Sequence, residues 1–129
     1  MQLKISDNTI SGQTNNLFFV EVEVEYISVK ELIKLRIYQE IEHYNNTQPE
    51  YFKSLVQPTN AEITLNGYRL IERRQLDPEK QYYLALDAFE KNVFFLLINN
   101  LQVDSLEQMI KLEENMELNF IKLTQLVGG

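Results

Sequence analysis

Residues 96–129 are LLINNLQVDSLEQMIKLEENMELNFIKLTQLVGG, and the apolar residues VFF (93–95) come directly before them. The resulting run VFFLLI has the continuous apolar character of a buried central strand. Asn99 and Asn100 then suit a two-residue hairpin turn, because that turn needs positive φ at both positions. We therefore predict a β-hairpin in which LQV (101–103) returns beside VFFLLI.

The second half of this stretch predicts one more strand. An irregular segment, DSLEQMIKL (104–112), leads into the polar turn EENM (113–116). The run ELNFIKL (117–123) follows, with Leu118 and Phe120 on one face of a last strand. Two consecutive glycines then close the sequence.

Two alternating segments predict a hairpin at the start of the chain. Met1, Leu3 and Ile5 alternate with polar residues, and FFVEVEVEY (18–26) alternates valines with glutamates. A period of two indicates a strand with one buried face, and the polar stretch 7–16 suits the turn between two such strands. The glutamate row is expected to face solvent, and a metal or a basic partner on that row is the less favoured alternative.

A long helix is predicted after this hairpin. Ser28 and Glu31 form a capping box, in which each side chain satisfies a free backbone N–H at the helix start. Apolar residues then recur at helical spacing as far as Asn45 and Asn46. The stripe comprises Val29, Leu32, Ile33, Ile37, Ile41 and Tyr44. We expect it to pack on the apolar face of the hairpin.

Residues 47–92 are interrupted by three prolines and follow no single period. We expect an inserted, largely helical segment here. Its clearest helix begins with Asp77 as N-cap and Pro78 at the first helical position, and runs to Lys91. Thr59 and Glu62 are spaced to cap another helix; the alternative for AEITLNGYRL is a strand with a turn at Asn66 and Gly67.

The composition disfavours several classes of function. The 129 residues suit one domain, and the formal net charge of −7 disfavours nucleic acid and anionic membranes, which attract clustered Lys and Arg. Without cysteine the chain has no disulfide and no thiolate. No secretory signal is evident, and no stretch approaches the roughly 18 apolar residues of a membrane span. We expect a cytoplasmic protein.

The element order of strand, strand, capped helix, strand, strand, irregular crossing and strand, followed by Gly-Gly, resembles the β-grasp fold of the ubiquitin-like family. The sulfur-carrier branch, which includes the molybdopterin-synthase small subunit and the thiazole-synthesis carrier, is most similar. INNLQV, EENMEL and LVGG carry the resemblance, which covers 1–46 and 93–129. The small carriers have a short connection in place of 47–92. The resemblance implies an α+β, mixed-sheet, single β-grasp domain over 1–129, with a flexible tail at 124–129.

The resemblance also implies a substrate and carrier, with no catalytic residue of its own and no metal site. An adenylating enzyme would use ATP and magnesium to activate the Gly129 carboxylate, with Gly128 threading beside it. A sulfurtransferase would then supply the sulfur of a thiocarboxylate, or a conjugation target would receive the acyl group by way of a thioester. By analogy the enzyme would dock on Ile121, Leu123, Leu126 and Val127, although ordinary strand or core packing is an equal alternative for the first two. The alternatives to a carrier are a non-covalent interaction or regulatory module with the same fold and, more distantly, a free enzyme.

Two further groups are weaker candidates. His43, the single histidine, is expected at the surface or near a helix end. Arg69, Arg73 and Arg74, with Lys53 as a fourth member, form a basic spot in an acidic chain. We expect these cations to pair with local glutamates; an acidic partner is the alternative.

Overall fold

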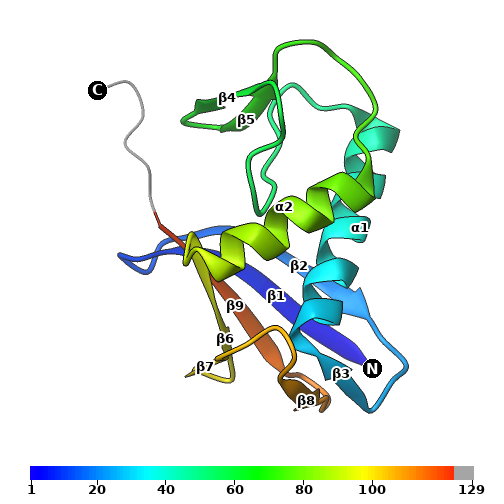
Figure 1. The fold of residues 1–129 in the computed structure, drawn as a ribbon, viewed down its shortest axis with the longest axis vertical. Helices are drawn as coiled ribbons and strands as arrows, with labels where there is room; N and C mark the ends of the chain where they lie inside the picture. The colour runs from blue at the N-terminus through cyan, green and yellow to red at the C-terminus, as the bar shows by residue number, and fades with distance from the viewer. Residues whose placement is uncertain (124–129) are drawn as a thin grey trace.

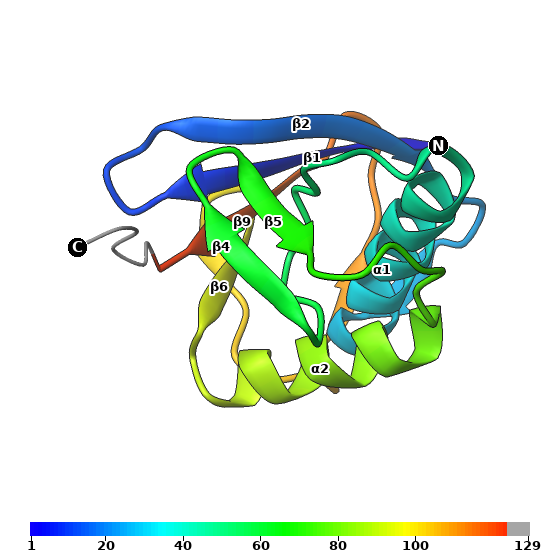
Figure 2. The same ribbon diagram turned by 90° about the horizontal axis from the view of Figure 1, so that it is seen from above.

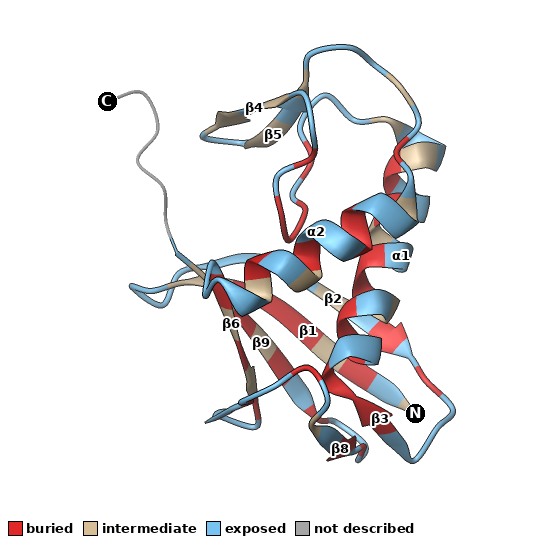
Figure 3. Ribbon diagram, in the orientation of Figure 1, coloured by how far each residue is buried: buried red, intermediate tan, exposed pale blue. Residues whose placement is uncertain are grey.

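The structure of the protein, a computed structural model, describes residues 1–123. Its elements are β1 (Gln2–Thr9), β2 (Thr14–Glu21), β3 (Tyr26–Ser28), α1 (Val29–Thr47), β4 (Ala61–Thr64), β5 (Gly67–Leu70), α2 (Pro78–Glu90), β6 (Phe94–Ile98), β7 (Leu101–Gln102), β8 (Met109–Lys111) and β9 (Glu117–Lys122) (Figure 1). The chain is α+β. Both helices lie on the same side of a mixed sheet, and the buried residues gather between the two layers (Figures 2 and 3).

The main sheet has the strand order β2-β1-β9-β6-β7. β1 and β9 are parallel, with Ile5 opposite Leu118, whereas the other neighbours are antiparallel. The last strand therefore lies in the middle of the sheet, between the first strand and β6. β3 and β8 pair separately, below the N-terminal end of α1 in Figure 1.

The predicted β1–β2 hairpin is confirmed, with Leu3 opposite Val20. The predicted alternation beyond it is wrong, because β2 ends at Glu21 and the side chains of Val24 and Tyr26 are about half exposed. The physical reason is a change of pairing partner. Beyond the bond from the Val22 N–H to the Met1 carbonyl, the chain leaves β1 and forms β3, which pairs with β8 instead.

The capped helix is confirmed as α1. The Glu31 N–H donates to Ser28 Oγ at 3.1 Å, and that hydroxyl donates to Glu31 Oε1 at 3.0 Å, which completes the capping box. The predicted apolar stripe is buried throughout, and α1 ends where Gln48 adopts the left-handed conformation at φ 41°. α1 packs against α2 as well as against the sheet.

The insertion is not largely helical, and that prediction was wrong. Between 48 and 92 the one helix is α2, which begins as predicted with the Asp77 side chain accepting from the Glu79 N–H. Thr59 and Glu62 do not cap a helix; β4 and β5 form a hairpin there instead. The hairpin stands apart from the main sheet, above it in Figure 1.

The turn at Gly67 explains why a hairpin forms in place of a helix. Gly67 has φ 122°, and a Cβ atom at this position would lie 2.9 Å from the Phe52 carbonyl oxygen. Phe52 and Tyr68 exchange backbone hydrogen bonds, so the hairpin is tied to the strand-like start of the insertion. A helix would offer neither the positive φ nor the extended backbone that this pairing needs.

The C-terminal predictions are largely confirmed. Asn99 and Asn100 have φ 48° and 69° and join β6 to the short β7. β9 forms over the predicted run, with Leu118 and Phe120 buried. The stretch expected to be irregular contains β8, which pairs with β3. Within residues 1–123 no helix is long and apolar enough to cross a membrane.

Phe120 offers a test of this core. Its ring is fully buried and lies 5.8 Å from the ring of Phe94. We predict that Phe120→Ala lowers the free energy of unfolding by about 3 to 5 kcal/mol, because it removes buried apolar surface and leaves a cavity. Phe19→Ala, at a half-exposed position on β2, should cost no more than about 1 kcal/mol. Urea unfolding of both variants makes the comparison; equal losses would contradict the placement of Phe120.

Candidate functional site at the end of the central strand

The candidate site lies where β9 ends at Lys122. The Leu123 N–H still donates to the Val93 carbonyl at 3.3 Å, so the chain is held beside β6 up to this point. Of the predicted docking residues, Ile121 is half-buried and Leu123 is 41% exposed. The other predicted site residues, Leu126, Val127, Gly128 and Gly129, lie outside the described residues.

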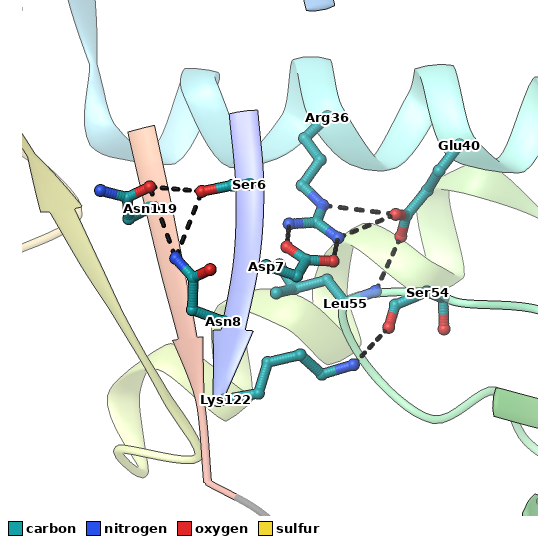
Figure 4. Close-up of polar contacts among 9 residues, drawn as sticks. All are labelled: Ser6, Asp7, Asn8, Arg36, Glu40, Ser54, Leu55, Asn119 and Lys122. Atoms are coloured by element: carbon teal, nitrogen blue, oxygen red, sulfur yellow. Dashed lines mark hydrogen bonds and ion pairs between the residues drawn. The ribbon is translucent and has the colours of Figure 1, made fainter. Parts of the chain in front are cut away.

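A buried ion network occupies the helix-facing side of this site (Figure 4). Asp7 continues the inward-facing series of Leu3 and Ile5 on β1, so its carboxylate points at α1. The Arg36 guanidinium, which is fully buried, donates from both terminal nitrogens to the two Asp7 oxygens, one of them at 2.6 Å. Arg36 also donates to Glu40, one helical turn further along, at 3.3 Å. One cation therefore serves two carboxylates.

Glu40 links this network to the insertion. Its second oxygen accepts the Leu55 N–H at 3.1 Å. Burial raises the pKa of Glu40 above its usual range, and the neighbouring Arg36 opposes part of that shift. Burial also acts to lower the pKa of Arg36, but the charges of Glu40 and Asp7 outweigh it and raise that pKa. Arg36 is thus a permanent cation in the core.

Lys122 fastens the insertion to the end of β9. Its ammonium donates to the Ser54 carbonyl at 2.8 Å and lies 5.4 Å from the centre of the Tyr68 ring. Burial lowers the pKa of Lys122, which is the expected direction for an amine taken out of water. The last residue of the central strand is therefore held by the segment that follows α1.

The opposite face of the sheet carries a polar stripe beside apolar side chains. Ser6 donates to Asn119 Oδ1 on the neighbouring strand, and Asn8 Nδ2 donates to Ser6 Oγ at 3.2 Å. Ile121 follows on β9, opposite Phe95, and both are half-buried. On this face the Ser6, Asn8 and Asn119 side chains are thus hydrogen-bonded to one another, with half-buried apolar side chains beside them.

Among residues 1–123 no three His, Cys, Asp or Glu side chains lie close enough to hold a metal ion, and every buried polar side-chain atom has a hydrogen-bond partner. Comparison of the chain with protein-family models, with curated proteins and with solved structures finds no match. Function is therefore inferred from the residues and the fold.

The weaker candidates named from the sequence lie at the surface or in local contacts. His43 is exposed on α1, as predicted. Arg69 pairs with Glu62 at 2.5 Å, as expected for a local ion pair, and Arg74 donates to the Thr59 carbonyl. These contacts bind β4, β5 and their flanking segments to one another. The guanidinium groups of Arg69 and Arg74 are therefore less available to an acidic partner.

Removing Arg36 should be costly. We predict that Arg36→Met lowers the free energy of unfolding by about 3 to 5 kcal/mol, because Asp7 and Glu40 would stay buried without their cation. The matched control is Lys91→Met, which removes an exposed pair with Asp87 and should cost at most about 0.5 kcal/mol. Thermal and urea unfolding measure both. A loss at Arg36 no larger than at Lys91 would show that the network does not hold the core.

Glu40 should make the free energy of unfolding depend on pH. Because its pKa is raised on folding, the folded state holds the Glu40 proton more tightly than the unfolded state. The contribution of Glu40 to stability is therefore complete below the ordinary value of 4.5 and declines as pH rises through its folded-state pKa. Glu40→Gln keeps an acceptor for the Leu55 N–H but does not titrate. We predict that the unfolding free energy of Glu40→Gln, minus that of the parent, increases with pH across this window. Urea unfolding at successive pH values tests it, and a flat difference would contradict it.

Proposed function

We propose that the protein is a ubiquitin-like carrier or modifier with a β-grasp fold, whose Gly129 carboxylate is adenylated by a partner enzyme for sulfur transfer or protein conjugation. The sheet supports this proposal most directly. With β3 and the insertion set aside, and β8 counted in the crossing, the order β1, β2, α1, β6, β7, crossing and β9 corresponds to the element order of the family that the sequence resembles. The segment with Gly128 and Gly129 follows directly on β9, the central strand.

The chemistry of such a carrier is supplied by its partner. A carboxylate is a poor electrophile, so the enzyme uses ATP and magnesium; a carboxylate oxygen of Gly129 attacks the α-phosphate and pyrophosphate leaves. A sulfur nucleophile then attacks the acyl carbon and AMP leaves, which yields a thiocarboxylate or a thioester. Glycine lacks a Cβ, so Gly128 and Gly129 suit a narrow channel that leads to the nucleotide.

The partner needs a second contact surface. Ordering a six-residue segment costs on the order of 6 to 12 kcal/mol in backbone entropy, which two glycines and four neighbours would hardly offset. We propose that the enzyme docks on the face of β9 and β6 that carries Ile121, together with Leu123. Leu126 and Val127 complete this surface in the proposal. The further partner is a sulfurtransferase, which supplies the sulfur, or a conjugation target, which receives the acyl group.

A non-covalent interaction module is the second candidate, and the exposed sheet face favours it. Leu17 and Phe19 on β2 are both about half exposed, beside the polar stripe of β1. A surface of this kind binds partners without any activated carboxylate. The two candidates differ in whether Gly129 is needed.

Removal of Gly129 separates the two candidates. The protein is isolated with Gly129 as its last residue and is incubated with its cognate activating enzyme, ATP and magnesium; we predict an AMP adduct by intact-mass spectrometry under acidic conditions. Chains that lack Gly129 or extend beyond it should give no adduct, yet their unfolding free energies should change by no more than about 0.5 kcal/mol, since glycine has no side chain to bury.

Leu65→Ser is the matched control for this experiment. Leu65 is 89% exposed at the β4–β5 turn, so this variant should be adenylated like the parent. A parent chain that stays unmodified by a verified cognate enzyme, or a chain without Gly129 that keeps full biological activity, favours the interaction module.

A further inference from the structure

β2 is an edge strand with a free side. It lies at one end of the sheet order, with β1 as its neighbour. The Val22 N–H donates to the Met1 carbonyl, and antiparallel residue pairs alternate between bonded and unbonded along the ladder. Phe18 and Val20 therefore bond to β1. Leu17 and Phe19 direct their backbone N–H and C=O groups away from β1, toward the open edge.

Two side chains from other segments already reach this edge. Gln39 of α1 donates to the Phe19 carbonyl at 3.3 Å, and Lys53 of the insertion donates to the Asn15 carbonyl at 3.3 Å. Leu17 lies between these two points. Among residues 1–123, no hydrogen bond to its backbone N–H or C=O group is found on the open side.

A groove of about 690 Å³ runs along the same edge. Asn16 and Phe18 of β2 line it on one side, α1 contributes residues that include Gln39 and His43, and the insertion contributes Pro49, Tyr51, Phe52 and Lys53. The groove therefore places a concave surface beside a row of backbone groups that can pair with another strand.

The residues of β2 themselves offer little protection against such pairing, and the irregularity of the β1–β2 ladder lies at the start of β2, opposite Asp7 and Asn8. β2 is TNNLFFVE, with no Lys, Arg or Pro and one glutamate at its end. Natural edge strands are usually blunted by charges, proline or bulges. Phe19 and Leu17 are 50% and 51% exposed on the outer face, and Phe18 is half-buried on the groove side. Apolar surface thus lies on both faces of this edge.

We propose that an extended apolar segment of a partner protein adds to β2 as a further strand between Asn15 and Phe19. Its backbone pairs with Leu17, and its side chains alternate between the groove beside Phe18 and the outer face beside Leu17 and Phe19. Apolar side chains lie on both faces, and polar residues such as Glu42 and His43 also line the groove. The segment is therefore a largely apolar run. The net charge of −7 favours basic flanks on that run. This site is independent of Gly129.

A peptide segment fits this edge better than a second copy of the chain. Gln39 and Lys53 touch the edge carbonyls, so α1 and the insertion stand within one side chain of the open side. A second copy would bring its own helical layer into the same space. An added single strand needs about 4.8 Å beside β2.

The test uses a panel of acetylated, amidated peptides with a lysine at each end and five Val, Ile, Thr or Phe residues between. Binding is measured by fluorescence anisotropy to the whole chain. The best binder is then N-methylated at alternate backbone positions. We expect one alternate set to bind at least about tenfold more weakly and the other set to bind like the parent peptide, because one set of amides faces Leu17. Equal effects of both sets, or no binding by any peptide of the panel, would overturn the proposal.

Amide hydrogen exchange locates the bound strand. We expect the Leu17 amide to exchange fast in the free protein and slowly with peptide, whereas the Phe18 amide is protected in both states. Leu17→Pro removes the donor on the open side and should abolish binding, and Leu17→Val is the matched control that retains it. If Leu17→Pro does not fold, the N-methylated series on the parent chain decides. Concentration-dependent dimerisation that protects Leu17 without peptide would assign the edge to a second copy and overturn the proposal.

Discussion

The Arg36 guanidinium has no exposed surface, and it lies between β1 and α1 with Asp7 on one side and Glu40 on the other. Taking ions out of water costs on the order of several kcal/mol for each ion, and paired geometry offsets this cost only where the hydrogen bonds are complete. The bidentate contact with Asp7 fixes the helix along β1. This one interaction therefore holds the position and rotation of α1 on β1, and the apolar stripe of α1 packs around it.

The same network, together with Lys122, fixes the position of the insertion on the helix and the sheet. Glu40 accepts the Leu55 N–H, and Lys122 donates to the Ser54 carbonyl, so two adjacent residues of the insertion contact the helix and the last strand. An inserted segment of irregular backbone needs such partners for its polar groups. The insertion thereby becomes a wall of the groove beside β2 and a support for the end of β9.

Local signals explain how much of the fold the sequence predicts. The Ser28 cap and the Asn99–Asn100 turn depend on neighbours within a few positions, so their patterns identify them. Arg36 and Asp7 are 29 positions apart, and no period connects them; the available signal was a charged residue on each apolar face. Thr59 and Glu62 have the spacing of a helix cap, but the cross-strand pairing around Gly67 makes that region a hairpin.

The same distinction between local signals and tertiary contacts applies to the candidate site. Alternation alone could place Ile121 on the last strand and Leu123 next to its end. The contact of Lys122 with Ser54, in contrast, depends on tertiary packing. β1 separates the edge of β2 from β9 in the sheet. A strand added at β2 would therefore leave the β9 face uncovered, and a partner docked near Ile121 would leave the β2 edge open. The two proposed sites therefore do not overlap, and the insertion contacts each region, through Lys53 and Ser54.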